Sequence, residues 1–462
     1  MGNINPKIFK SYDIRGIYPA ELNEEAAYLI GRAFARKAKA KAIVVGSDMR
    51  LSGPVLKEKL IAGITDEGAD AIDIGLVAID TVYFAVGILK YEAGIMITAS
   101  HNPKEYNGFK MALKDMVWVR GEELKEDVLK LSNQAISDQR SGDQSDKISN
   151  IKGKIIQKDI LPDYIKHVLS FCDSKKIKPL KVAVDAGNGM AGKIMPLLQT
   201  HLPIKVIPLN FTLDGNFPSH PSNPLLPESQ VQIAEEIKKQ KADLGVIFDG
   251  DTDRLIFADE TGRAHQADYT LLILAREFLN REPGTGIAYN AICSKSIPDI
   301  VTEWGGRPIR TKVGYVNVSA AMRENNCVVG GEVSAHYCFR DNGYSDSGFI
   351  AFVILLQLLS EDSRPFSEIV KPFYRYLKAP EQNFVFEKRE DIEKIIAAVK
   401  KHYSAGKQDE LDGLTVWQEN WWFNIRPSNT EPLLRLTIEA GNDKLLAEKN
   451  KELVDFIESG TK

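Results

Sequence analysis

The stretch LGVIFDGDTDR, residues 244–254, runs from an apolar segment straight into three aspartates. A short apolar run such as LGVIF, bounded by turn residues, is typical of a buried β-strand. Asp249, Asp251 and Asp253 follow at every second position, so their carboxylates gather where the strand ends. In open α/β sheets, ligands bind at the carboxyl ends of strands. The stretch therefore predicts an α/β sheet with a ligand-binding loop at its edge.

The same layout occurs three times along the chain. Three short apolar strands each lead through a turn into an expected helix: IVVGSD (43–48), VAVDAGNGMAG (182–192) and IAYNAICSK (287–295). A second strand with a polar loop follows each of them: GIMITASHNP (94–103), LGVIFDGDTDR (244–254) and CVVGGEVSAH (327–336). Repetition of this βα pattern predicts three tandem α/β domains with mixed, mostly parallel sheets. The three polar loops are candidates for one shared cleft.

The last part of the chain has a different pattern. After residue 377, WWFNIR (421–426) and LLRLTIEA (433–440) alternate like antiparallel strands around the loop PSNTEP. Residues 391–403 and 443–457 have helical periodicity. We expect a C-terminal α+β domain.

Composition and charge limit the class of protein. The chain has 462 residues and a net charge of −4, which argues against nucleic acid as a main partner. Residues 137–146 are polar and without apolar periodicity, which indicates a surface linker. The apolar run at 349–359 is too short to cross a membrane and predicts a buried helix. Without a signal peptide or paired cysteine motifs, we expect a cytoplasmic protein with reduced thiols.

The three aspartates have the chemistry of a metal site. Mg²⁺ prefers hard oxygen ligands, and three neighbouring carboxylates repel one another without a cation. The alternatives are a solvated acidic turn and a calcium loop, in which Glu260 would be the twelfth residue. A calcium loop needs Gly at position 6, where this chain has Arg254, and a helix where LGVIF predicts a strand.

Three further loops carry polar groups suited to a sugar phosphate. Ser100 and His101 lie in TASHNP, where a phosphorylated serine could donate its phosphate beside a metal. RPSNTEP combines a guanidinium, hydroxyls and backbone N–H groups that can form an anion cradle. GEVSAH offers a carboxylate and a hydroxyl for vicinal sugar hydroxyls. Taken singly, TASHNP also fits a turn with helix-capping groups, RPSNTEP a hairpin loop and GEVSAH a polar strand end. Lys110 and Arg15, taken singly, also fit surface charges.

Together, the ordered motifs SYDIRG, TASHNP, DGDTDR, GEVSAH and RPSNTEP resemble the α-D-phosphohexomutase family, within it the phosphomannomutase/phosphoglucomutase branch. The resemblance spans residues 11–432. It implies four domains in a heart shape around a central cleft. We assign residues 1–146 to the phosphoserine domain, 158–258 to the metal domain, 259–374 to the sugar-binding domain and 375–462 to the C-terminal domain.

The resemblance also implies roles for individual residues. Ser100 would carry the phosphate and complete the magnesium site, one Mg²⁺ per chain, with the three aspartates. Arg254 would orient the phosphoserine loop. The groups expected near the reacting phosphate are Arg15, His101 and Lys110, the last two being candidates for proton transfer. The expected sugar contacts are Glu332, Ser334 and His336. The expected cradle for the non-reacting phosphate is Arg426, Ser428, Asn429 and Thr430.

The implied reaction interconverts hexose 1-phosphate and hexose 6-phosphate through a hexose 1,6-bisphosphate intermediate. Glucose and mannose differ only at C2, and a Glu332–Ser334 clamp on O3 and O4 contacts the same groups in both. We therefore expect activity on mannose and glucose phosphates. Phosphoglucosamine mutase activity and a non-catalytic sugar-phosphate-binding relative remain alternatives.

Two positions depart from the pattern of close relatives. Ile292 stands where they often carry a lysine, and Tyr315 where some carry a histidine. Both positions contact substrate in those relatives, so the departures bear on sugar preference rather than on phosphate transfer. We expect sugar phosphates as the partners, no nucleic acid, no membrane, and a monomer or weak dimer.

Overall fold

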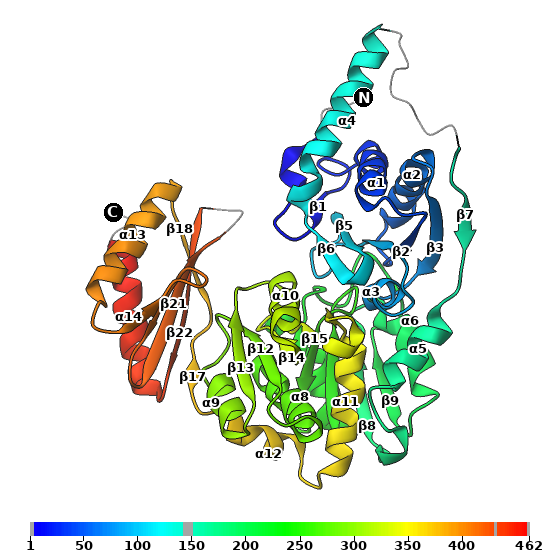
Figure 1. Ribbon diagram of the computed structural model, residues 1–462. Helices are drawn as coiled ribbons and strands as arrows, with labels where there is room; N and C mark the ends of the chain where they lie inside the picture. Colours follow the sequence, from blue (N-terminus) through cyan, green and yellow to red (C-terminus); the bar gives the residue numbers. More distant parts are fainter. Residues whose placement is uncertain (1–3, 142–150, 429–431, 460–462) are drawn as a thin grey trace. The chain divides into compact units, whose positions relative to one another are not determined.

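The computed structural model of the chain describes residues 4–141, 151–428 and 432–459 (Figure 1). The chain forms two compact units, each built from two stretches: Met1–His265 with Ser334–Ser367, and Gln266–Val333 with Glu368–Lys462.

The first unit contains a seven-stranded sheet in the order β1-β5-β4-β2-β3-β7, with β6 beside β5. Its strands are β1 (Ile14–Ile17), β2 (Ala42–Ser47), β3 (Asp70–Leu76), β4 (Ala93–Ile97), β5 (Tyr106–Leu113), β6 (Val117–Val119) and β7 (Ile155–Gln157). Strands β4, β2, β3 and β7 run parallel, whereas β5 is antiparallel to β4 and β1. The parallel order of β4 and β2 places the loops that follow them at the same edge of the sheet.

Helices cover this sheet and close its core. They are α1 (Glu24–Ala38), α2 (Gly53–Asp66), α3 (Ile79–Gly87) and α4 (Gly121–Ser141), with 3₁₀ turns at η1 (Pro6–Ile8) and η2 (Lys114–Met116). Asn23 caps α1 by accepting a hydrogen bond from the Ala26 N–H. Helices α1 and α2 lie so close that a Cβ on Gly63 would stand 2.1 Å from the Tyr28 carbonyl oxygen. The expected linker at 137–146 is partly wrong, because α4 continues to Ser141.

A second sheet of the first unit has the order β11-β10-β8-β9. Its strands are β8 (Lys181–Asp185), β9 (Lys205–Leu209), β10 (Leu244–Phe248) and β11 (Leu255–Ala258). The neighbouring helices are α5 (Leu161–Leu169), α6 (Ala191–Gln199) and α7 (Pro227–Gln240), with η3 (Ser174–Lys176). Strand β10 is parallel to β8 and antiparallel to β11, so the three aspartates lie in the turn from β10 to β11.

The stretch Ser334–Ser367 completes the first unit. It contains β15 (Tyr337–Phe339), η4 (Arg340–Asn342), β16 (Ser345–Asp346) and α11 (Gly348–Glu361). Helix α11 is buried along most of its length and packs on α5 and β11, which confirms the expected buried helix. Its Gln357 side chain accepts a hydrogen bond from the Asp173 N–H at 2.7 Å. Among the described residues, no helix is long and apolar enough to cross a membrane.

The second unit begins with three parallel strands, in which β12 lies between β13 and β14. The elements are α8 (Ala267–Arg281), β12 (Gly286–Asn290), α9 (Ser296–Glu303), β13 (Arg307–Thr311), α10 (Tyr315–Asn325) and β14 (Cys327–Gly331). Strands β12 and β14 thus repeat the parallel neighbours β2 and β4, and β8 and β10. This confirms the expected α/β class with mixed, mostly parallel sheets.

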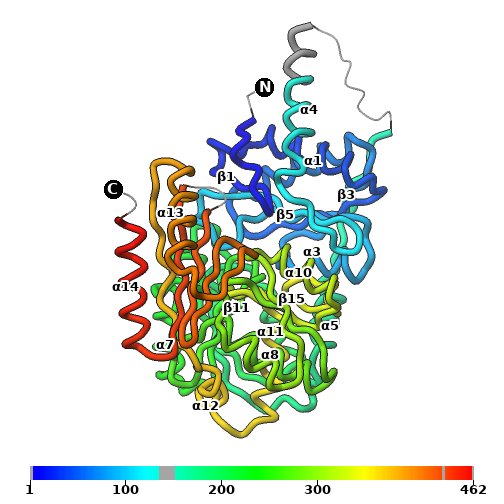
Figure 2. Tube along the Cα trace, turned by 60° about the vertical axis from the view of Figure 1, so that its left-hand side comes forward, coloured from blue at the N-terminus to red at the C-terminus, as the bar shows by residue number. Residues whose placement is uncertain are grey.

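The second unit ends in a six-stranded antiparallel sheet, reached through α12 (Phe366–Val370) and η5 (Lys371–Phe373). The order is β17-β22-β21-β20-β19, with β18 beside β22. The elements are β17 (Leu377–Lys378), β18 (Gln382–Val385), α13 (Arg389–His402), β19 (Lys407–Asp409), β20 (Leu414–Trp417), β21 (Trp421–Pro427), β22 (Leu433–Ala440) and α14 (Asp443–Ser459). Alternate strand residues and both helices share one apolar core. Both views show α14 alongside the strands, as an α+β domain requires (Figures 1 and 2).

Candidate active site

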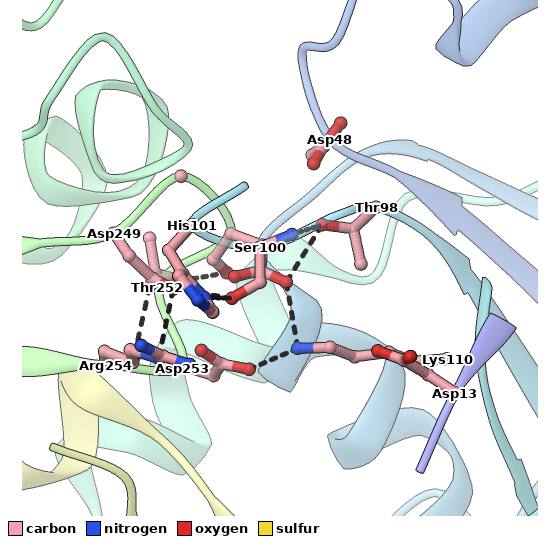
Figure 3. Close-up of polar contacts among 12 residues, drawn as sticks. Asp13, Asp48, Thr98, Ser100, His101, Lys110, Asp249, Thr252, Asp253 and Arg254 are labelled. Carbon is pink, nitrogen blue, oxygen red and sulfur yellow. Dashed lines mark hydrogen bonds and ion pairs between the residues drawn. The ribbon is translucent and has the colours of Figure 1, made fainter. Parts of the chain in front are cut away.

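Ser100 follows β4 and is held against the aspartate loop (Figure 3). It is 1% exposed, and its hydroxyl donates a 2.8 Å hydrogen bond to Asp249 Oδ2. The Ser100 N–H donates to Thr98 Oγ1 at 2.9 Å, and His101 Nδ1 lies 3.3 Å from Ser100 Oγ. The hydroxyl therefore contacts a carboxylate from another sheet. The loop does contain a turn at Ser100 and His101, but β5 follows it, so the expectation that its polar groups cap a helix is wrong.

The three aspartates form one buried cluster. Asp249, Asp251 and Asp253 each offer a carboxylate oxygen, and these oxygens lie within 4.8 Å of one another. Their side chains are at most 1% exposed, so the solvated-turn alternative is wrong. Thr252 turns the chain between them with φ +73°, in the left-handed region. The calcium-loop alternative is also unsupported, because β11 follows the turn and the Glu260 carboxylate accepts hydrogen bonds from Ser367 instead.

Lys110 supplies positive charge to this cluster. Its ammonium lies on β5 and donates to Asp253 Oδ2 at 2.5 Å and to Asp251 Oδ2 at 3.2 Å (Figure 3). Lys110 is 3% exposed, which shows that the surface-charge explanation of this residue is wrong. Although burial raises the pKa of Asp253, Lys110 and His336 together lower it well below its usual range. Burial, Asp253 and Asp251 raise the pKa of Asp249 well above its usual range.

The donor set of the cluster fits a hard divalent cation. Three carboxylates with no sulfur ligand are the chemistry that Mg²⁺ prefers. Among the described residues, Asp251 Oδ1 is buried without a hydrogen-bond partner, which is costly for a carboxylate. A cation bound between Asp249, Asp251 and Asp253 would satisfy that oxygen.

Arg254 and His336 border the aspartates. The backbones of the two residues form an isolated antiparallel β-bridge. Arg254 Nε lies 3.4 Å from His336 Nε2. Arg254 also approaches Asp249, with Nε 3.8 Å from Oδ2. His336 Nε2 lies 3.4 Å from Asp253 Oδ1, and Ser334 Oγ is 2.9 Å from His336 Nδ1. Ser334 and His336 thus belong to the same buried polar network as the aspartates.

Arg15 and His101 come from the seven-stranded sheet: Arg15 lies on β1, and His101 lies in the loop between β4 and β5. Arg15 Nη1 donates to Asn102 Oδ1 at 2.5 Å, and its Nη2 contacts Asp13 at 2.5 Å. Arg15 is therefore tied to the Ser100 loop and is not an isolated surface charge. Burial, Arg254 and Arg15 lower the pKa of His101 well below its usual range, which favours a neutral ring.

Glu332 lies at the end of β14, in the second unit. It is 3% exposed, and its Oε1 accepts hydrogen bonds from the Gly314 N–H at 2.6 Å and from Asn290 Nδ2 at 3.1 Å. The GEVSAH motif is divided between the two units, because Ser334 opens the stretch that belongs to the first.

Arg426 and Ser428 lie where β21 ends. Arg426 Nη2 donates to Glu381 Oε2 at 3.0 Å, and Arg435 faces Arg426 on the neighbouring strand. The Ser428 N–H donates to the Leu433 carbonyl at 2.7 Å. The other two residues of the expected cradle, Asn429 and Thr430, lie outside the described residues.

The two departures from the family pattern lie in the second unit. Ile292 is buried, and its carbonyl accepts a 2.5 Å hydrogen bond from Lys378 Nζ. Tyr315 is the first residue of α10 and is 8% exposed. Lys295, the lysine three positions after Ile292, forms an ion pair with Asp299 at 2.7 Å.

Sequence reasoning missed two residues that support the site. Arg50 follows β2 and donates hydrogen bonds to backbone carbonyls of the Ser100 loop. Asp346 is fully buried beside His336, and burial together with Asp253 raises the pKa of Asp346 to about 7. The parallel order of β2 and β4 could have pointed to Arg50, because the loops after both strands lie at one edge.

Comparison with known proteins covers nearly the whole chain. The four domain models of the phosphoglucomutase/phosphomannomutase family match in order: domain I at 6–133, domain II at 162–262, domain III at 266–376 and the C-terminal domain at 381–456. These matches cover more than half of the chain and contain every motif discussed above.

Individual relatives agree with this match. A protein of Xanthomonas campestris named phosphohexose mutases is 37% identical over 458 residues, covering 98% of this chain and 99% of the relative. A phosphomannomutase of Vibrio cholerae is 36% identical, covering 97% of this chain and 98% of the relative. The crystal structure of a phosphoglucomutase/phosphomannomutase family protein from Burkholderia thailandensis has a TM-score of 0.87 and 31% identity, covering 99% of this chain and 98% of that one. The chain therefore belongs to the phosphoglucomutase/phosphomannomutase family.

Proposed function

We propose that this enzyme, an isomerase, interconverts hexose 1-phosphate and hexose 6-phosphate, with Ser100 as the phosphate carrier. The observation that carries the proposal is the 2.8 Å contact between Ser100 Oγ and Asp249 Oδ2 inside the buried aspartate cluster. A phosphate on Ser100 would face three carboxylates, and that arrangement needs a cation to offset the repulsion. One Mg²⁺ per chain, held by Ser100, Asp249, Asp251 and Asp253, would supply that charge and neutralise the transferring phosphoryl group.

The transfer proceeds in two halves. The bond between phosphorus and Ser100 Oγ breaks as the free sugar hydroxyl forms its own bond to phosphorus and releases its proton. The resulting hexose 1,6-bisphosphate then reverses in the site, and its other phosphate returns to Ser100. Such transfers depend mainly on positioning and charge neutralisation. Arg15, Lys110 and Arg254 provide the positive charge. His101 or Lys110 assists the transfer of the proton from the attacking sugar hydroxyl to Ser100 Oγ as the bond between Oγ and phosphorus breaks.

The remaining assigned residues bind the sugar and the second phosphate. Glu332 is fixed by two hydrogen bonds and would accept hydrogen bonds from sugar hydroxyls together with Ser334. His336 is held beside Ser334 and would add a further substrate contact. Arg426, Ser428, Asn429 and Thr430 would bind the phosphate that is not reacting. Since Glu332 and Ser334 contact O3 and O4, mannose and glucose phosphates should both turn over.

The test is to incubate the purified enzyme with Mg²⁺, a trace of hexose 1,6-bisphosphate, and mannose, glucose or glucosamine 1-phosphate in separate reactions. Phosphorus NMR then follows the appearance of each 6-phosphate. We expect the mannose and glucose 6-phosphates. Formation of glucosamine 6-phosphate alone would favour the phosphoglucosamine alternative. Absence of any product, together with an intact mass lacking phosphate, would favour a non-catalytic binding protein.

A further inference from the structure

Arg50 is buried against the Ser100 loop, and its guanidinium donates hydrogen bonds to four backbone carbonyls between β4 and the start of β5. Its side chain is 1% exposed. Nη2 donates to the carbonyls of Ser100 and Asn102, both at 2.7 Å. Nη1 donates to the carbonyls of Pro103 at 2.8 Å and Tyr106 at 2.9 Å. One guanidinium thus donates hydrogen bonds to four carbonyls within the seven residues 100–106, between β4 and the start of β5.

The guanidinium is itself held in place. Arg50 Nε lies 3.4 Å from Asp48 Oδ2, and Asp48 Oδ1 accepts a hydrogen bond from the Arg50 N–H at 3.0 Å. The Asp48 N–H donates to the Ile97 carbonyl at the end of β4. The guanidinium also lies over the Phe217 ring, 5.1 Å from its centroid. Arg50 is therefore a fixed support and not a flexible side chain that the loop could displace.

The Ser100 backbone needs such a support. Its φ is +49°, in the left-handed region that non-glycine residues rarely occupy and that persists where surrounding contacts enforce it. Besides Arg50, the Ser100 carbonyl accepts a 3.3 Å hydrogen bond from Ser222 Oγ. Ser222 Oγ in turn accepts from the Gly250 N–H at 3.1 Å. The backbone conformation of Ser100 is thus coupled to the aspartate loop.

We propose that Arg50 is a positioning residue for phosphoryl transfer: its hydrogen bonds to four loop carbonyls keep Ser100 Oγ aligned with the Asp249 carboxylate. This inference rests on the proposed function of Ser100. A planar guanidinium presents five N–H donors in a fixed fork, whereas lysine has a single nitrogen at its tip. Lysine at position 50 would keep the charge but leave buried carbonyls without donors.

The experiment compares Arg50→Lys with Arg32→Lys. Arg32 is a matched control, because it is 4% exposed in the same unit and its Nε donates to Glu67 at 2.6 Å, away from the Ser100 loop. We expect Arg50→Lys to lower kcat about 100-fold, as small misplacements of reacting groups do, with KM within about threefold of the parent. Arg32→Lys should lower the melting temperature without changing kcat. A kcat for Arg50→Lys within threefold of the parent, or a change in KM alone, would overturn the proposal.

Rescue separates positioning from general folding. In Arg50→Ala, added guanidinium or methylguanidinium should raise kcat at least several-fold, whereas urea at the same concentration should not. A folded Arg50→Ala enzyme with no gain in kcat contradicts the proposal. If Arg50→Ala does not fold, Ser222→Ala replaces it: removal of the second donor to the Ser100 carbonyl should lower kcat a few-fold at constant KM, and an unchanged kcat counts against the proposal.

The parent enzyme is assayed first, so that two failures can be told apart. A parent without mutase activity and without phosphate on Ser100 refutes the proposed function. A parent with activity, matched by an equally active Arg50→Lys enzyme, refutes only the role of Arg50.

Discussion

The Ser100 region and the Arg426 region hold their polar groups in opposite ways. Ser100 and the three aspartates are at most 1% exposed, and Ser100 is fixed through both its hydroxyl and its backbone. Arg426 is partly exposed, and its main partner is Glu381, which is one-third exposed. A group that receives a phosphoryl gains from a fixed geometry. In the proposed function, Arg426 binds alternate phosphates of the sugar bisphosphate, and it would then have to exchange Glu381 for phosphate.

The largest effect should come from Ser100→Ala, which removes the proposed phosphate carrier from the buried Ser100 region. We expect mutase activity to fall by at least about 10⁴-fold, as loss of a catalytic nucleophile does. The intact mass of the purified variant should also lack the phosphate that we expect on the parent. Full activity in this variant would mean that another residue carries the phosphate.

Asp251→Asn should have the next largest effect, because it removes the charge of one proposed metal ligand while keeping the size of the side chain. We expect a loss of roughly 10³-fold in kcat and a higher Mg²⁺ requirement, since metal charge neutralisation contributes several kcal/mol. Asp259→Asn is the matched control: it is also buried, but its carboxylate pairs with His265 at 3.0 Å and lies outside the cluster. Equal Mg²⁺ dependence in both variants would mean that Asp251 is not a metal ligand.

Arg426→Ala should act mainly on substrate binding. Loss of one charged hydrogen-bonding group costs about 1.5–3 kcal/mol, so KM should rise roughly 10- to 100-fold with little change in kcat. Arg435→Ala removes the facing cation, which also lies near Glu381 at 3.8 Å, and should raise KM less. A fall in kcat without a change in KM would mean that Arg426 acts in phosphoryl transfer, like the Ser100 region, and not in substrate binding.

The smallest effect is expected from Glu381→Gln, which removes the carboxylate that holds Arg426. Exposed ion pairs contribute about 0.2–1 kcal/mol, so KM should fall about 1.5- to 5-fold as phosphate loses its competitor. Substrate titrations of both enzymes under one salt condition would check this. A rise in KM would instead show that Glu381 positions Arg426 for its ligand.

Local patterns predicted the elements of this chain well. LGVIF became β10, the apolar run at 349–359 became α11, and WWFNIR paired with LLRLTIEA as β21 and β22. These outcomes follow from hydrophobic periodicity, which depends only on nearby residues. The proximity of Ser100 and the three aspartates was also predictable, because these residues stand at strand ends. Their roles in phosphate transfer and metal binding stay predictions.

The supporting contacts could not be predicted, because they join residues far apart in the chain. Arg50 reaches carbonyls 50 to 56 positions away, and Lys110 reaches aspartates more than 140 positions away. The family resemblance placed Lys110 near the reacting phosphate, and the strand order could have pointed to Arg50, but neither indicates these individual hydrogen bonds. The division of GEVSAH between two compact units could not be predicted either, because Glu332 and Ser334 are only two positions apart in the chain.

The placement of α11 affects how the chain can acquire its structure during synthesis. Helix α11 packs on α5 and β11, yet some seventy residues of the other unit, Gln266–Val333, are translated between β11 and Ser334. The apolar surfaces of α5 and β11 therefore stay uncovered on the ribosome until residue 361 has left the exit tunnel. Nascent chains that stall within the intervening segment would expose this surface and become targets for chaperones.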